Sequence, residues 1–238
     1  MTAQVITSVA PSHPIEGQQE RAIGSWITAG FDVISVNEPS EIAEVEAVIR
    51  KAARNTSKIY GKPYPLLDDI LAACTADVAI ITNSDIELIG NVTEAIEKAE
   101  EAVYIGNRFD HDGDPTKGVT YQHGFDLFIV HRKHFQHIHP ALFTLGQTWW
   151  DYYLPWCMAK AGVPLRRVPE RTIAHRRHAV QYSRMDWERM TEHFKFIAND
   201  KQFKHLNASN MTHRIFGLIT RHAENNRRYS QNKNCYHL

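Results

Sequence analysis

The 238-residue sequence lacks the features by which several protein classes are known. It has only three cysteines, Cys74, Cys157 and Cys235, and no CxxC pair, so neither a disulfide framework nor a cysteine zinc site is indicated. No apolar run approaches the roughly 20 residues of a membrane-spanning helix, and the first residues have neither the basic start nor the long apolar core of a signal peptide. We therefore expect a cytoplasmic protein without a membrane span.

The sequence motifs of four common enzyme classes are also absent. The chain contains no GxGxxG, GxxxxGK[ST], HExxH or GxSxG pattern. This removes support for a Rossmann dehydrogenase, a P-loop NTPase, a zincin or a serine hydrolase.

Charge is unevenly distributed along the chain, although the formal net charge is zero. Residues 201–238 carry seven Lys or Arg and one Glu. Such a segment is suited to an anionic partner, and it could equally be a solvated basic tail.

Apolar strands and helices alternate along most of the chain. Helices are predicted over 16–29, 41–53, 66–75, 91–102, 149–162 and 185–199, and strands over 4–9, 31–37, 78–82, 102–109, 125–131 and 164–169. The strands are continuously apolar, which is typical of an α/β fold with a parallel sheet covered by helices on both faces. No linker divides the chain cleanly, so we expect one domain over 1–180 with a basic helical C-terminal extension over 181–238.

Polar side chains follow the most apolar strand. The run DVAIITNSDIEL, residues 77–88, ends in Asn83, Ser84 and Asp85, and ligands of parallel sheets bind beyond the carboxyl ends of the strands. Mg²⁺ and Mn²⁺ prefer carboxylate oxygens together with water and substrate phosphates. Asp85 is therefore a candidate metal ligand; the alternative is that Asn83 and Asp85 cap a turn.

A second candidate segment is GQTWWDYYLPW, in which Asp151 is the only acid among aromatic residues. Burial among rings raises the pKa of a carboxyl group and improves it as a general base. Trp149 and Trp150 could stack on a sugar or a base, although aromatic residues at helical spacing are more often core. Gly146 would let the backbone approach a ligand closely. Asp126 is a weaker carboxylate candidate that could instead anchor a neighbouring group.

The order of these parts resembles the GT-A fold of nucleotide-sugar-dependent glycosyltransferases. The resemblance covers Val5 to His178 and rests on the acidic motif that ends the buried strand of YGKPYPLLDDILAACTADVAIITNSDIEL. In that family the motif is Asp-any-Asp; here Asn83 stands at its first position, and Asp85 keeps the acid that usually ligates the metal. The resemblance implies a GT-A-like α/β fold with a mostly parallel central sheet, and Mn²⁺ or Mg²⁺ as cofactor.

The resemblance also implies roles for individual residues. A late histidine of IAHRRH, His175 or His178, would complete the metal site, and Asp151 would deprotonate the acceptor. From their own chemistry, and not from the resemblance, Gly146, Trp149, Trp150 and Asp126 are expected to contact the acceptor. The residues implied in nucleotide binding are Ala10, Pro11, Ser12, Asn37, Lys62, Asn83, Ser84, Arg176 and Arg177, the arginines because their guanidinium groups match diphosphate oxygens.

The expected function is transfer of a hexose or pentose from a nucleotide diphosphate donor to an acceptor hydroxyl, metal-assisted and inverting. Two alternatives stay open at this point. The chain could be a nucleic-acid-binding module whose basic C-terminal tail grips phosphates, or a glycosyltransferase that acts on modified DNA bases.

Overall fold

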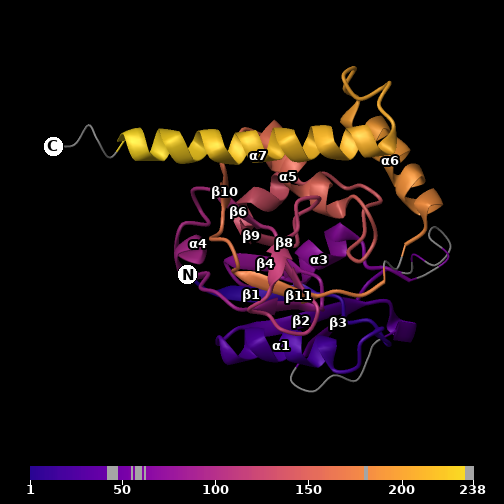
Figure 1. Cartoon of the computed structure of the whole chain (residues 1–238), viewed down its shortest axis with the longest axis vertical. Coiled ribbons are helices and arrows are strands. Elements are labelled where there is room, and N and C mark those ends of the chain that lie inside the picture. The colour runs from indigo at the N-terminus through magenta and orange to yellow at the C-terminus, as the bar shows by residue number, and fades with distance from the viewer. Residues whose placement is uncertain (42–47, 55, 57–60, 62, 180–181, 234–238) are drawn as a thin grey trace.

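The computed structural model describes residues 1–41, 48–54, 56, 61, 63–179 and 182–233 (Figure 1). The helices are α1 (Gln18–Thr28), α3 (Leu67–Ala73), α4 (Thr93–Glu97), α5 (Trp150–Lys160), α6 (Arg184–Ala198) and α7 (Ala208–Lys233), with short 3₁₀ helices at η1 (Pro39–Glu41) and η2 (Arg132–His137). Side chains of Arg50 and of residues 226–233 are outside the description.

A seven-stranded sheet forms the centre of the fold. Its strands lie in the order β10 (Leu165–Arg167), β6 (Val103–Gly106), β9 (Leu127–His131), β4 (Val78–Thr82), β1 (Ala3–Thr7), β2 (Asp32–Asn37) and β3 (Ile49–Ala52). All neighbours are parallel except β9, which runs antiparallel to β4 and β6. The mostly parallel α/β sheet expected from the sequence is confirmed.

A smaller sheet joins the first at the end of β4. It contains β5 (Ile86–Leu88), β11 (Ile173–Arg176), β7 (Phe109–His111) and β8 (Gly118–Thr120), in that order. Because β5 begins directly after Asp85, that residue lies where the chain passes from the large sheet to the small one.

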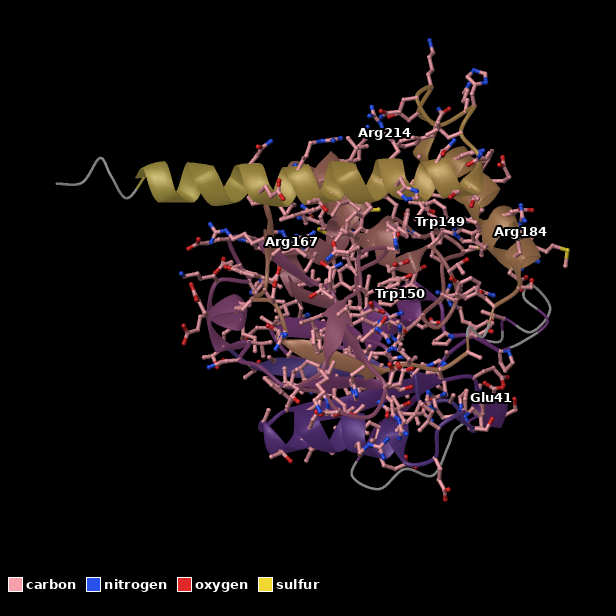
Figure 2. The ribbon with its side chains drawn as sticks, in the orientation of Figure 1. Glu41, Trp149, Trp150, Arg167, Arg184 and Arg214 are labelled. Carbon is pink, nitrogen blue, oxygen red and sulfur yellow. The ribbon has the colours of Figure 1, made fainter. Side chains whose placement is uncertain are left out.

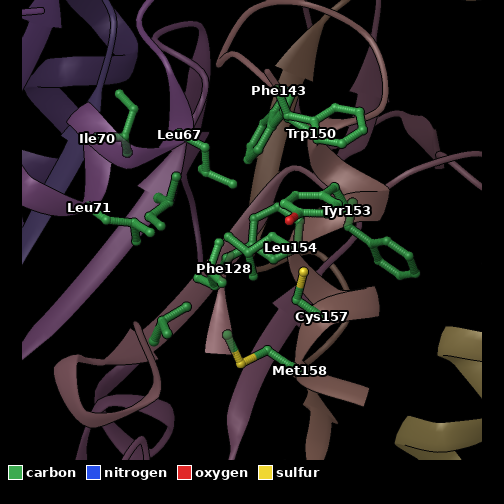
Figure 3. Packing of buried hydrophobic residues seen from close by; sticks show 14 of the residues in the cluster. Leu67, Ile70, Leu71, Phe128, Phe143, Trp150, Tyr153, Leu154, Cys157 and Met158 are labelled. Atoms are coloured by element: carbon green, nitrogen blue, oxygen red, sulfur yellow. The ribbon is translucent and has the colours of Figure 1, made fainter. Parts of the chain in front are cut away.

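Helices cover both faces of the large sheet, as the apolar strands require. In β4, Ala79 and Ile81 pack into a core with α3 and α5, whereas Val78 and Ile80 pack into a second core with α1 and α4, and all four side chains are fully buried. Figure 3 shows the first core, where residues of α3 such as Leu67 and Ile70 lie near residues of α5.

The helix predicted over 41–53 is wrong at its end, because residues 49–52 form strand β3. Residues 42–47 lie outside the described part of the chain. The β-branched pair Val48 and Ile49 favours extended backbone, and β3 forms the edge of the sheet by pairing in parallel with β2. The polar segment 107–124, for which no strand was predicted beyond residue 109, contains a hairpin of β7 and β8.

The last helix is bound to the core along its first half. Met211, Ile215, Ile219 and Ala223 are buried at intervals of one helical turn, and α7 packs on α5 and β10. Figure 1 shows α7 crossing α5, with its C-terminal end reaching beyond the rest of the fold. The helices of the described residues, α7 included, are too short or too polar to span a bilayer.

Replacing Ile215 tests whether α7 is an integral part of the folding unit. Ile215→Ala should lower the free energy of unfolding by about 2–4 kcal/mol, since it leaves a cavity in the core, and it should shift a single cooperative transition in urea. Phe196→Ala is the control, because Phe196 is 80% exposed and its loss should change stability by less than about 0.5 kcal/mol. A main transition that stays unchanged in Ile215→Ala would show that α7 docks independently.

Candidate active site

The topology brings polar residues from distant parts of the chain to one edge of the large sheet. Strands β1 and β4 are parallel neighbours, so the loop that contains His13 and the segment that contains Asp85 leave the sheet on the same side. Strand β9 runs the other way, so Asp126, which precedes it, lies at this edge too. Arg108 lies at this edge as well, because it follows the end of β6 at Gly106. The Gly106 carbonyl accepts a hydrogen bond from the Asp126 N–H at 2.9 Å.

A cavity of ≈ 890 Å³ opens at this edge. It is lined by most of the residues that the sequence singled out, from both candidate segments: Ala10, Pro11, Ser12, Asn83, Ser84, Asp85, Asp126, Gly146, Trp149, Trp150, Asp151, His175 and His178. Asp85 and Asp151, which are 66 positions apart in the sequence, therefore share one cavity.

Four of the expected nucleotide contacts do not line the cavity or cannot be placed. Asn37 is buried, and its side-chain amide donates to the Val9 carbonyl at 2.8 Å, so it braces the loop after β1. Arg177 donates to Asp112 at 2.8 Å. Arg176 points toward the turn at Gly113 in the small sheet. Lys62 lies outside the described residues.

Three histidines surround the carboxylate of Asp85. Its Oδ2 atom lies 3.0 Å from His178 Nε2, 3.3 Å from His13 Nε2 and 3.4 Å from His175 Nε2. Burial alone would raise the pKa of Asp85, but the hydrogen bonds from the three imidazoles outweigh it and hold the pKa well below its usual range. Asp85 is therefore an anion throughout the neutral range.

His175 is held in place from its far side. Its Nδ1 lies 2.9 Å from Asp110 Oδ1, which fixes the ring so that Nε2 faces Asp85. Burial lowers the pKa of His175, yet the bonds to Asp110 and Asp85 raise it to about 9. A carboxylate behind an imidazole is the arrangement that orients histidine ligands in metal sites.

Arg108 connects this cluster to the other part of the cavity. Its guanidinium donates to Asp110 Oδ1 at 2.8 Å and to Asp126 Oδ1 at 3.0 Å, and it lies 4.1 Å above the ring of Tyr121. The positive charge of Arg108 is thus shared by two carboxylates. Asp126 Oδ2 is buried and has no hydrogen-bond partner among the described residues, so it can accept a bond from a ligand.

Asp151 lies in the first turn of α5, where its carboxyl group packs tightly against neighbouring backbone. A Cβ on Gly124 would come within 2.7 Å of Asp151 Oδ2, so a larger residue there would displace this carboxylate. Burial, reinforced by the negative charge of Asp126, raises the pKa of Asp151 to about 7. The residue before the helix, Trp149, has a φ of 77° although it is bulky and buried, a conformation that costs about 1–2 kcal/mol.

Several cavity residues had not been singled out from the sequence. They are His13, Arg108, Tyr121, Tyr182 and Trp187, and from the start of α7 Ser209, Thr212 and His213. Only His13 had a usable signal, because it follows the loop Ala10–Ser12 that the resemblance assigned to the nucleoside. The others depend on packing between elements far apart in sequence.

The donor set at Asp85 fits a divalent metal ion. Ligand atoms of His13, Asp85 and His178 all lie within 4.8 Å of one another, close enough for one ion to replace the hydrogen bonds between them. Two imidazole nitrogens and a carboxylate oxygen are ligands that transition metals accept.

Comparisons with known proteins bear on the fold. No family described by a sequence model matches this chain, and the search of curated proteins gave no match. Among solved structures, the crystal structure of S. aureus TarS 1–349 in complex with UDP-GlcNAc is similar, with a TM-score of 0.57 over 92% of this chain and 72% of that chain, at 11% sequence identity. The fold is that of the nucleotide-sugar glycosyltransferases. The GT-A resemblance drawn from the sequence is confirmed at the level of the fold.

Titration of Asp151 should be visible in the stability of the protein. The pKa of about 7 in the native state lies above the reference value of 3.8, so the native state gains stability from the bound proton at low pH and loses it as the pH rises through this interval. Asp151→Asn cannot ionise and should therefore melt at a higher temperature than wild type at about pH 8, with a smaller difference at about pH 5.

The matched control for this experiment is Asp112→Asn, which changes an exposed carboxylate. Its melting temperature should differ from wild type by a similar amount at both pH values. If Asp151→Asn showed the same flat difference, the carboxyl group of Asp151 would not be the buried acid described here.

Proposed function

We propose that this protein is a glycosyltransferase that moves a sugar from a nucleotide diphosphate donor to an acceptor hydroxyl, with metal assistance and inversion at the sugar. The observation that supports it most is that the Asp85 cluster and Asp151 line one cavity at the carboxyl edge of a sheet with this fold. The TarS structure holds UDP-GlcNAc, so a UDP-hexose is the first donor to test.

The donor nucleotide is assigned to the part of the cavity between β1 and β4. Gln19 on α1 ties the two sides together, because its Oε1 accepts from the Ala10 N–H at 2.9 Å and from the Ser84 hydroxyl at 2.6 Å. The loop Ala10–Ser12 and the segment Asn83–Ser84 thereby form one wall. This wall offers backbone and hydroxyl groups to a nucleoside and its diphosphate.

The metal is assigned to Asp85, His13 and His178, with His175 beside them. A divalent cation bound there would offset the charge that develops on the leaving diphosphate. Of the two ions expected from the sequence, Mn²⁺ is the better match, since Mg²⁺ takes oxygen ligands and reluctantly gives up water, whereas imidazole suits transition metals.

Asp151 is assigned the role of general base. Its carboxylate accepts the proton of the acceptor hydroxyl as the hydroxyl oxygen forms a bond to the anomeric carbon. The bond from that carbon to the diphosphate oxygen breaks, and its electron pair leaves with the nucleotide. Asp126, through its unpartnered Oδ2, accepts a hydrogen bond from a sugar hydroxyl.

We assign different parts of the active site to the two segments of the chain. Residues 1–180 supply the donor site and the base, and residues 181–238 complete the acceptor side, because Trp187, Ser209 and His213 belong to the cavity wall. Gly146, Trp149 and Trp150 are close to Asp151 in the sequence and line the same cavity. We assign them to the part of the cavity that would bind the acceptor.

Loss of the carboxylate at position 85 should abolish turnover of the donor. Asp85→Ala should reduce Mn²⁺-dependent release of nucleotide diphosphate by about 100-fold or more, because a bound metal contributes several kcal/mol of charge stabilisation. Release would be measured over a panel of nucleotide sugars. Asp32→Ala, at an exposed acid, should behave as wild type, and full activity of a folded Asp85→Ala would refute the metal assignment.

The rate of transfer should follow ionisation of Asp151. A base must be deprotonated to act, so kcat should rise with pH and level off above an apparent pKa near the value of about 7 given by burial. In Asp151→Asn transfer should fall by about 100-fold or more, while donor binding, followed by the increase in melting temperature with donor concentration, should be kept. A pH profile that is flat across the neutral range would contradict this role.

A further inference from the structure

A second hollow lies on the outer side of α7 and meets the cavity at His213. This groove has a volume of ≈ 480 Å³ and is lined by Gln202, Leu206, Asn210, His213, Arg214, Gly217 and Arg221. His213 lines both the groove and the main cavity. Figure 2 shows Arg214 on the side of α7 away from the sheet, whereas Trp149 and Trp150 lie on the side toward it.

The groove presents two exposed guanidinium groups that are not neutralised by ion pairs. Neither Arg214 nor Arg221 forms an ion pair with a carboxylate of the described residues, and Arg214 is held by a 3.1 Å bond to the side-chain oxygen of Gln202. The two arginines are seven residues apart on one helix, which separates them by about 10 Å along its axis. They can therefore contact two separate phosphates.

Gly217 lies between Arg214 and Arg221 in the sequence, and its lack of a side chain makes the groove deeper at this point. A glycine inside a helix costs about 1 kcal/mol relative to alanine. Packing does not require it here, because a Cβ at Gly217 would meet nothing nearer than the Arg221 guanidinium at 3.8 Å. The missing side chain leaves room on the surface of α7 for a ligand.

The part of the cavity around Asp151 carries negative charge, whereas the groove carries positive charge. Around the proposed base, the carboxylates of Asp126 and Asp151 face one guanidinium of the described cavity lining, that of Arg108, which Asp110 and Asp126 already bind. A negatively charged group would be repelled there. Partly exposed rings, among them Tyr121, Tyr182 and Trp187, line the same region.

We infer that the cavity and the groove form one track for a single-stranded nucleic acid acceptor, with an uncharged nucleoside unit among the rings and the phosphates of the flanking chain on Arg214 and Arg221. Nucleic acid alternates neutral, flat nucleoside units with anionic links, which matches the separation of charge between the cavity and the groove. A ribose 2′-hydroxyl or a hydroxylated base would supply the reacting hydroxyl. Aromatic faces bind bases by stacking, and arginines bind the backbone. The inference rests on the proposed transferase function only for the reacting hydroxyl, whose proton would go to Asp151.

The test is binding of labelled single strands of DNA and RNA, about ten nucleotides long, to the full-length protein without donor. The variant Arg214→Gln/Arg221→Gln should raise Kd about tenfold or more. It should also reduce the slope of log Kd against log salt by about 1.4, the value for two lost phosphate contacts to a single strand. The charge-matched control is Lys51→Gln/Arg184→Gln, at exposed residues outside the groove, which should change Kd less than about twofold.

A second variant separates nucleic acid from other polyanions. Tyr182→Leu should weaken binding of the oligonucleotides and leave binding of inorganic polyphosphate unchanged, because polyphosphate has no base to stack. The inference is overturned if the two double variants weaken binding equally, if polyphosphate competes as well as the oligonucleotides, or if neither strand binds. These results do not bear on donor turnover, so failure of the inference and failure of the transferase function are distinguishable.

Discussion

The burial of one carboxylate among three imidazoles fixes the geometry of the whole site. Asp85 lies three residues beyond the end of the central strand β4 and immediately precedes β5, so it lies at the junction of the two sheets. Its partners come from the loop after β1, from β11 and from the segment after β11. The contacts of this single side chain therefore hold three separate stretches of chain together. A bound cation would use the same geometry, because each imidazole already directs a nitrogen toward Asp85.

A chain of charged groups carries that geometry to the other part of the cavity. His175 contacts Asp110, Arg108 bonds to both Asp110 and Asp126, and the charge of Asp126 helps to raise the pKa of Asp151. Buried ion pairs contribute little net stability, because desolvation offsets their attraction. Ionisable groups with shifted pKa values gathered in one cavity are instead typical of catalytic sites. The strained backbone of Trp149, which sets the start of α5 and hence the position of Asp151, is consistent with this.

The parts of the site that follow from local sequence could be predicted, and those that follow from packing could not. Asp85 was accessible because an apolar strand that ends in polar residues is a local pattern, and Asp151 because it is alone among aromatic residues. Arg108 lies near the end of the strand predicted over 102–109 with no local pattern that marks it as a site residue, and its role comes from the antiparallel strand β9, which brings Asp126 beside it. Asn37 is a polar residue at the end of a strand, where ligand-binding residues are expected, yet its side-chain amide donates to the Val9 carbonyl of the neighbouring loop. Strand β3 was missed because pairing with the exposed edge of β2 outweighs the helical pattern of its charges.

The last helix, α7, both packs against the core and contributes side chains to the cavity wall, and the sequence composition alone would not connect these two roles. One stripe of α7, Met211, Ile215 and Ile219, is buried against α5 and β10, and this fixes the rotation of the helix about its axis. Thr212 and Phe216, which come directly after Met211 and Ile215, are partly buried. Arg214 and Arg221 are exposed. Because Thr212 and His213 also line the cavity, packing of the inner stripe determines the position of this part of the cavity wall. The first half of α7 is thereby held in fixed register with the proposed catalytic base.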